Sequence, residues 1–121
     1  MELTQKHYEL FKAECEQWIN RLGITSWNVF YAFEDMRQDS TFARCYSDKT
    51  QRSATLALTK DSARVNDETD YNELVKSFAK HEVLELLLTR LSDMATENDV
   101  DRDTADEATH EVINLLMRAL K

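Results

Sequence analysis

The near absence of glycine and proline is the feature that most constrains the fold of this 121-residue sequence, which has no proline and a single glycine, Gly23. Tight two-residue hairpins favour Asn-Gly or Asp-Gly at the turn. We therefore expect any strands to be joined by longer polar loops. A chain of this length is expected to form one domain, residues 1–121, whose core needs neither disulfides nor a structural metal.

Residues 4–22 carry the pattern of an amphipathic helix. One apolar stripe recurs at steps of three and four, which is the spacing of a single helical face, and it consists of Tyr8, Phe11, Cys15, Trp18 and Leu22. Thr4 is a suitable N-cap, and Gly23 follows the last stripe residue, where a left-handed residue is wanted.

The middle of the chain has the alternating pattern of β-strands. Residues 27–34 alternate with a period of two and are rich in aromatic and β-branched side chains, and residues 41–47 and 53–60 are read as two further strands. The connections are too short for helical crossovers, so we expect a small three-stranded antiparallel sheet. An acidic connector at 61–70 follows the third strand.

Two further helices are expected, over residues 71–92 and 104–120, with a loop at 93–103 between them. Thr104 and Glu107 have the spacing of a capping box at the start of the last helix. The fold class predicted from these elements is α+β, with an N-terminal helix, a small sheet and two C-terminal helices.

Composition excludes several classes of function. Charged residues make up 31% of the chain, and its net charge is −8. Phosphate binding needs a basic surface, so nucleic acid is not expected as a partner, whereas a cationic partner or a metal ion would suit the acidic balance. No apolar run is long enough for a membrane span. Cys15 and Cys45 are expected to be free thiols in a reducing cytoplasm.

The motif with most chemical content is His81-Glu82-Val83-Leu84-Glu85, an H-E-x-x-E pattern on the second predicted helix. In the H-E-x-x-H motif of zinc peptidases, two His one turn apart bind the metal and the Glu is the general base. Here Glu85 takes the place of the second His. At 100° per residue, His81 and Glu85 lie in an otherwise apolar arc, where an unpaired carboxylate is costly. The alternatives are a buried His–Glu hydrogen-bonded pair and a cleft floor that is open to water.

A catalytic zinc site needs a third protein ligand, and the last helix is the place to look for it. The buried stripe expected on that helix consists of Ala105, Ala108, Val112, Leu115 and Ala119. Glu111 lies at the border of this stripe, and His110 points to nearly the opposite side. The sequence therefore favours Glu111 over His110 as the third ligand, and the alternative for Glu111 is a surface carboxylate paired with Arg118.

The whole chain resembles a family of small zincin-like metallopeptidases that is common in phages and prophages. The segments that carry the resemblance are Trp27-Asn28-Val29, Ala43 in the second strand, Ser53-Ala54-Thr55-Leu56-Ala57-Leu58, the helix from Ala79 to Leu88, and the closing helix from Glu107 to Leu120. The active helix of the family usually reads HEVLHLLL, so this chain departs from it at Glu85. The resemblance implies a minimal zincin fold, a metal held by His81 and Glu85, and Glu82 as the base that activates a metal-bound water. It also implies a cytoplasmic location in a bacterial or phage-infected cell.

Two functions follow as hypotheses. In the first, the protein is a metal-dependent peptidase whose substrate lies along the edge of the sheet at the 53–60 strand. The metal would be zinc, although a His81, Glu85 and Glu111 set carries two negative charges and so favours manganese or another harder metal. In the second, the protein is an inactive member of the same fold, an acidic module that binds or inhibits a host protein.

Overall fold

The fold is α+β, as predicted. The computed structural model describes residues 3–36, 41–60, 70–98 and 100–121. Its elements, in chain order, are α1 (Gln5–Leu22), β1 (Asn28–Glu34), β2 (Ala43–Asp48), β3 (Ser53–Thr59), α2 (Tyr71–Glu97) and α3 (Arg102–Ala119). The predicted connector at 61–70 lies almost wholly outside the described residues. No helix in the described ranges is long and apolar enough to cross a membrane.

The sheet is mixed rather than antiparallel. Its strand order is β1-β3-β2, with β1 parallel to β3 and β2 antiparallel to β3. The prediction of an all-antiparallel sheet is wrong because β3 inserts between the first two strands. Strands that alternate in direction along the chain are antiparallel only to their sequence neighbours, and the insertion brings the first and third strands side by side. Leu56 of β3 therefore pairs with Tyr31 on one side and Cys45 on the other.

The ends of α1 are set by the residues that the sequence indicates. Thr4 is the N-cap and forms a capping box with His7, whose Nδ1 accepts the Thr4 backbone N–H at 3.0 Å. Gly23 ends the helix in the left-handed region, with φ of 69°. A side chain there would be strained by that backbone conformation, which accounts for the one glycine of the chain.

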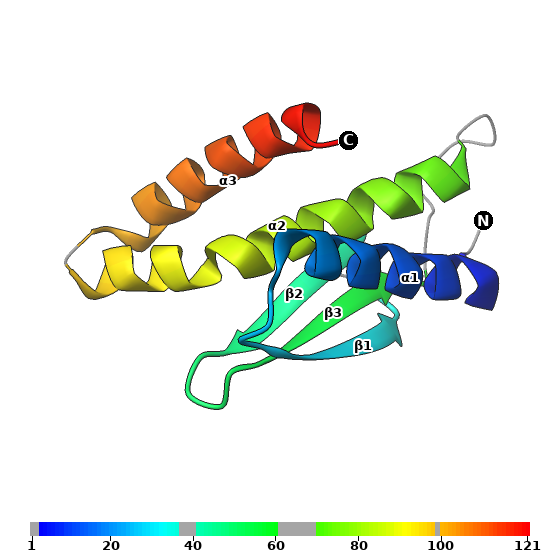
Figure 1. The fold of residues 1–121 in the computed structure, drawn as a ribbon, viewed down its shortest axis with the longest axis horizontal. Helices are drawn as coiled ribbons and strands as arrows, with labels where there is room; N and C mark the ends of the chain where they lie inside the picture. The colour runs from blue at the N-terminus through cyan, green and yellow to red at the C-terminus, as the bar shows by residue number, and fades with distance from the viewer. Residues whose placement is uncertain (1–2, 37–40, 61–69, 99) are drawn as a thin grey trace.

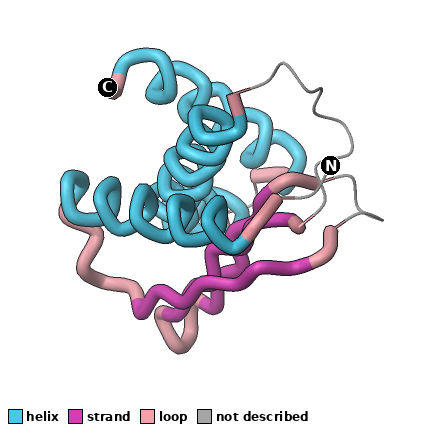
Figure 2. Tube along the Cα trace, turned by 90° about the vertical axis from the view of Figure 1, so that its right-hand side faces the viewer, coloured by secondary structure: helices cyan, strands magenta, loops and turns pink. Residues whose placement is uncertain are grey.

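All three helices lie on one side of the sheet, with α1 and α2 nearest to it (Figures 1 and 2). The core lies between these two helices and the strands, and its buried members are Leu3, Phe11, Cys15, Trp18, Leu56, Leu58, Val75, Ala79 and Val83. At the β1 side, Tyr8 of α1 stacks on Phe33 with ring centroids 5.1 Å apart. The apolar stripe of α1 and the inward face of β3 thus meet in this core, as the helical spacing in α1 and the alternation of residues in β3 predict.

The turn between α2 and α3 is shorter than predicted. Helix α2 continues to Glu97, and α3 begins at Arg102 with Asp101 as its N-cap, whose carboxylate accepts the backbone N–H of Thr104. The expected capping box at Thr104 and Glu107 is therefore displaced by a cap three residues earlier. An aspartate is as strong a cap as threonine, and the earlier start adds hydrogen-bonded residues to the helix.

Helix α3 packs chiefly against α2, on the side remote from the sheet (Figure 1). The predicted buried stripe is right only at Ala105, which is buried: Val112 and Leu115 are 42% and 53% exposed, and Ile113, which lies outside the predicted stripe, is buried. A helix with one main packing partner buries only a narrow strip. The strip that α3 buries is centred roughly 80° from the predicted one, so that apart from Ala105 different side chains face α2.

Candidate metal centre

Helix α2 brings the H-E-x-x-E motif to the wall of a cleft beneath β2. The buried residues Val75, Ala79 and Val83 fix the rotation of the helix against the core. Glu82 is also buried, with 4% of its surface exposed. The side chains of His81 and Glu85 are 33% and 27% exposed, so they lie at the border between core and cleft rather than in the middle of an apolar arc.

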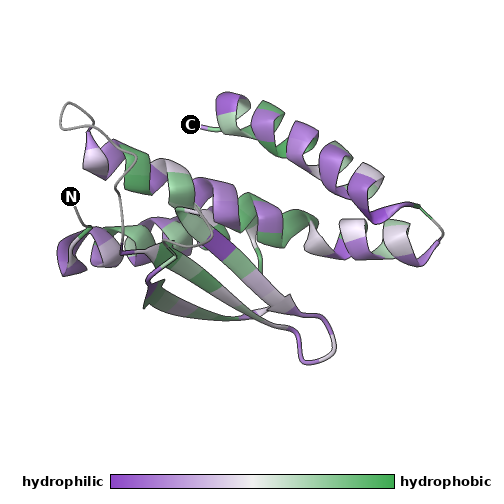
Figure 3. Ribbon diagram, turned by 180° about the vertical axis from the view of Figure 1, so that it is seen from behind, coloured by the Kyte–Doolittle hydropathy of each residue, from purple (hydrophilic) through white to green (hydrophobic). Residues whose placement is uncertain are grey.

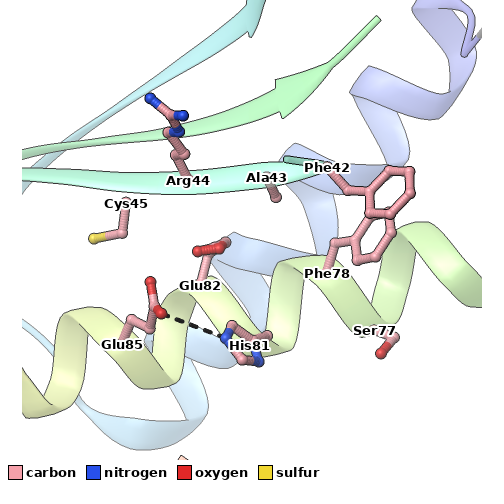
Figure 4. A pocket seen from close by; sticks show the side chains of 9 residues that line it. All are labelled: Phe42, Ala43, Arg44, Cys45, Ser77, Phe78, His81, Glu82 and Glu85. Carbon is pink, nitrogen blue, oxygen red and sulfur yellow. Dashed lines mark ion pairs between the residues drawn. The ribbon is translucent and has the colours of Figure 1, made fainter. Parts of the chain in front are cut away.

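The cleft has a volume of about 470 Å³ and opens between β2 and α2 (Figure 4). Phe42 and Phe78 close one end, with parallel rings whose centroids are 5.2 Å apart. Cys45 lines the cleft on the β2 side, opposite the motif. The strand beside the cleft is β2, an edge strand, whereas β3 is paired on both sides. The prediction that a substrate lies along the edge of the 53–60 strand is therefore wrong, because that strand has no free edge.

Three potential metal ligands meet at one end of this cleft, where His110 of α3 lines a second, neighbouring pocket that shares Cys45 and Glu85 with it. One ligand atom from each of His81, Glu85 and His110 lies within 4.8 Å of the other two, so that this group could hold a metal ion. Oε1 of Glu85 is 3.4 Å from Nε2 of His81 and 3.1 Å from Nε2 of His110. The rings of the two histidines are 6.1 Å apart, centroid to centroid. Two helices thus present two imidazoles around one carboxylate.

The orientation of His110 fits a metal ligand. Its Nδ1 is 2.8 Å from the backbone oxygen of Asp106, which can only accept a hydrogen bond, so Nδ1 carries the proton. Its Nε2, which faces Glu85, then has a free lone pair unless the ring takes a second proton. A metal cation between Nε2 of His110 and the Glu85 carboxylate would occupy the place of a proton on Nε2. A histidine whose other nitrogen donates to a backbone carbonyl is the usual arrangement of a metal ligand.

Glu82 and Glu85 are electrostatically coupled. Burial, with a smaller contribution from the charge of Glu85, raises the pKa of Glu82 well above its ordinary value. Burial alone would also raise the pKa of Glu85, but hydrogen bonds from His81 and Glu82 and the charges of both histidines bring it below the ordinary value. At neutral pH, and without a metal, Glu82 is therefore the protonated member and donates to an ionised Glu85.

The structure brings together two of the three predicted ligands, His81 and Glu85, and places the predicted base Glu82 beside them. Glu111 is exposed and belongs to no potential metal group within the described ranges, and His110 occupies the position expected of it. The preference for Glu111 rested on the predicted stripe, of which α3 buries only Ala105. Once the helix turns to bury Ala105 and Ile113, His110 points toward α2 and Glu111 points away.

Both cysteines are free thiols, as predicted. Cys15 is buried between α1 and α2, where its Sγ is 3.9 Å from the backbone oxygen of Ala79. Burial, and next the charge of Glu82, raises the pKa of the Cys45 thiol to about 12. A thiol of that pKa is protonated at neutral pH and is a poor metal ligand or nucleophile.

Comparisons of the chain with protein families, with curated proteins and with solved structures found no match. The resemblance to zincin-like metallopeptidases consequently rests on the sequence motifs alone. What the structure adds is the clustering of His81, Glu85 and His110, a group that could hold a metal ion, with Glu82 buried beside it.

Proposed function

We propose that this protein is a metal-dependent hydrolase of the zincin type that acts on peptides, with one divalent metal ion held by His81, Glu85 and His110. The observation that carries the proposal is the approach of two imidazole nitrogens and one carboxylate oxygen to within 4.8 Å of one another. Two His and one Glu form a known ligand set of catalytic zinc sites, in which a fourth position stays open. The H-E-x-x-E motif and the family resemblance support the same function.

Zinc is the metal that this ligand set favours. The set contains one carboxylate rather than the two of a His81, Glu85 and Glu111 set, so that a divalent ion would keep a net positive charge. Imidazole nitrogens suit zinc better than they suit manganese or magnesium, which prefer oxygen. With His110 in place of Glu111 as the third ligand, the ligand set carries one negative charge instead of two. The excess negative charge that would weaken zinc chemistry at an H-E-x-x-E motif is therefore absent.

The metal ligands, Glu82 and β2 would each have a role in the proposed reaction. A bound metal would supply a Lewis acid that polarises the scissile carbonyl and acidifies water. Glu82 would take the proton of the attacking water and pass it to the leaving amine. Positive charge at the ligand group lowers the pKa of a neighbouring carboxyl, which brings Glu82 toward the ionised form that a base needs. The edge of β2, which pairs with no other strand in the described ranges, would hold the peptide in an extended conformation.

Metal content tests the ligand assignment. We expect about one equivalent of zinc in protein purified without added metal, and a loss of most of it in His110→Ala. Glu111→Ala is the matched control, because Glu111 is the neighbouring residue and is exposed. Elemental analysis of the three proteins measures the difference. Equal metal content in His110→Ala and Glu111→Ala, or no metal in any of them, would refute the assignment.

Hydrolysis tests the role of Glu82. With a mixture of internally quenched peptides as substrate, we expect Glu82→Gln to retain the metal and to lower the rate by about 100-fold or more. Glu73→Gln, an exposed carboxylate on the same helix, is the control and should leave the rate unchanged. If the zinc-loaded protein hydrolyses none of the peptides, the peptidase function fails and the alternative, a non-catalytic binding protein, is favoured.

A further inference from the structure

An apolar groove lies between the C-terminal half of α2 and α3, outside the metal centre. Its volume is about 210 Å³, and its aliphatic lining includes Leu88, Leu91, Ala95, Val100, Ala108 and Val112. Several of these residues are open to solvent: Leu91 is 66% exposed, and Val112 and Val100 are 42% and 39% exposed. Figure 3 shows the apolar bands along both helices. Exposed apolar residues gathered in one groove mark a binding surface more often than scattered ones do.

The two walls of the groove differ in charge. On α3, Asp103, Glu107 and Glu111 follow one another at intervals of four residues, so they form one stripe along the helix, beside Ala108 and Val112. All three carboxylates are exposed, and none forms an ion pair with another residue in the described ranges. The α2 wall is instead apolar apart from Ser92, and consists of Leu88, Leu91 and Ala95.

We propose that this groove binds an amphipathic helix of a partner protein that carries lysine or arginine residues along one flank. The apolar face of such a helix would cover Leu91 and Val112, and its basic flank would face the Asp103, Glu107 and Glu111 stripe. Helix-in-groove binding uses apolar anchors at i, i+3, i+4 and i+7, a pattern that matches a cleft between two helices. The net charge of −8 would also attract a cationic segment over longer distances.

A second copy of this chain does not fit the groove as well. Each copy carries the same acidic stripe at the edge of the groove and the same net charge of −8. Two copies that met in this region would therefore bring charges of the same sign together, which opposes association. The proposal does not depend on hydrolysis or on a metal, because the groove and its acidic stripe contain none of the three proposed ligands.

The test uses fluorescence anisotropy with two synthetic 18-residue helical peptides. Both have the same apolar stripe, and one flank is lysine in the first peptide and glutamate in the second. We expect saturable binding of the lysine peptide alone, weakening as salt is raised. Binding of both peptides with equal affinity, or of neither, would overturn the proposal.

Variants locate the binding on the protein. Leu91→Ser and the double variant Glu107→Lys/Glu111→Lys should each weaken binding of the lysine peptide by about tenfold or more. The double variant should in addition bind the glutamate peptide. Matched controls are Phe30→Ser, which changes an apolar residue that is 58% exposed on β1, and Glu16→Lys, which reverses an exposed charge on α1.

Circular dichroism checks that each variant is folded, and surface substitutions of this kind should change stability by only about 0.5 kcal/mol. Unchanged affinity in Leu91→Ser, or an equal loss in Phe30→Ser, would refute the groove as the site. Sedimentation equilibrium tests whether a second copy of the chain occupies the groove. A dimer that Leu91→Ser dissociates would show that it does and would overturn the proposal.

Discussion

The two sides of α2 differ in how completely they are buried. On the side of α1 and the sheet, Phe11, Val75 and Val83 are wholly inaccessible to solvent. On the side of α3, the buried residues of the third helix are Ala105 and Ile113, and its other apolar side chains are partly or largely exposed. The side of α2 that faces α1 and the sheet therefore contributes most of the buried core. The groove lies on the side that faces α3, and the candidate metal centre lies at the border between the two, beside the cleft under β2.

The two sides are joined by Lys80 as well as by the helix itself. The Lys80 ammonium donates to the backbone oxygens of Met117 and Leu120 at the end of α3. It also lies 5.1 Å from the ring centroid of Trp18, on α1. One side chain of α2 thus contacts both of the other helices, and it precedes the proposed ligand His81 by one residue.

The largest effect is expected from the well-buried side. Phe11→Ala should lower the free energy of unfolding by about 3–5 kcal/mol, because it leaves a cavity in the core. Leu115→Ala, on the exposed face of α3, should change it by no more than about 0.5 kcal/mol. Urea denaturation measures both values. Similar losses for the two variants would contradict the division between the sides of α2.

Zinc should stabilise the α3 side in particular. A ligand that binds only the folded state adds about 2.7 kcal/mol at a free concentration of 100 times its Kd. We expect this gain in the native protein and little of it in His110→Ala, as measured by thermal denaturation with and without zinc. Hydrogen exchange should slow on α3 more than on α1, because His110 is the ligand that α3 contributes. Equal slowing on both helices would argue against this placement of the metal.

Removal of the Lys80 contact, which links the two sides of α2, should lower the free energy of unfolding by a smaller amount. Lys80→Met keeps the apolar stem but loses the hydrogen bonds to the end of α3, which should cost about 1 kcal/mol in urea denaturation. Lys76→Met is the control, because the pair that Lys76 forms with Glu73 is exposed and long at 3.7 Å. A loss as large in the control as in Lys80→Met would mean that charge alone, and not the contact with α3, is responsible.

The smallest effect is a difference in thiol reactivity. Burial is the main cause of the raised pKa of both Cys15 and Cys45, so both should react slowly with a disulfide reagent at pH 8. Cys45 should nevertheless react first, because it is partly exposed at the cleft whereas Cys15 is wholly buried. In the unfolded protein the two rates should converge. Faster modification of Cys15 would contradict the deeper burial of Cys15 relative to the cleft residue Cys45.

Some features of the fold could be predicted because they depend on residues close together in the sequence. The cap at Thr4, the left-handed end at Gly23 and the apolar stripe of α1 all arise within a few turns of one helix. The same holds for the strand at 53–60, whose inward residues Leu56 and Leu58 alternate as a strand requires. The strand order could not be predicted in this way, because it depends on where β3 inserts relative to strands earlier in the chain.

The same distinction between local and long-range features applies to the candidate site. The sequence by itself determined that His81, Glu82 and Glu85 lie within one turn of a helix, since helical geometry alone sets that spacing. Only the tertiary structure decided that Glu82 is the buried residue, that β2 rather than β3 borders the cleft, and that His110 rather than Glu111 faces Glu85. The physical reason is that the rotation of α3 about its axis is set by its packing on α2. This is a contact between separate segments, which the hydrophobic periodicity within α3 does not reveal.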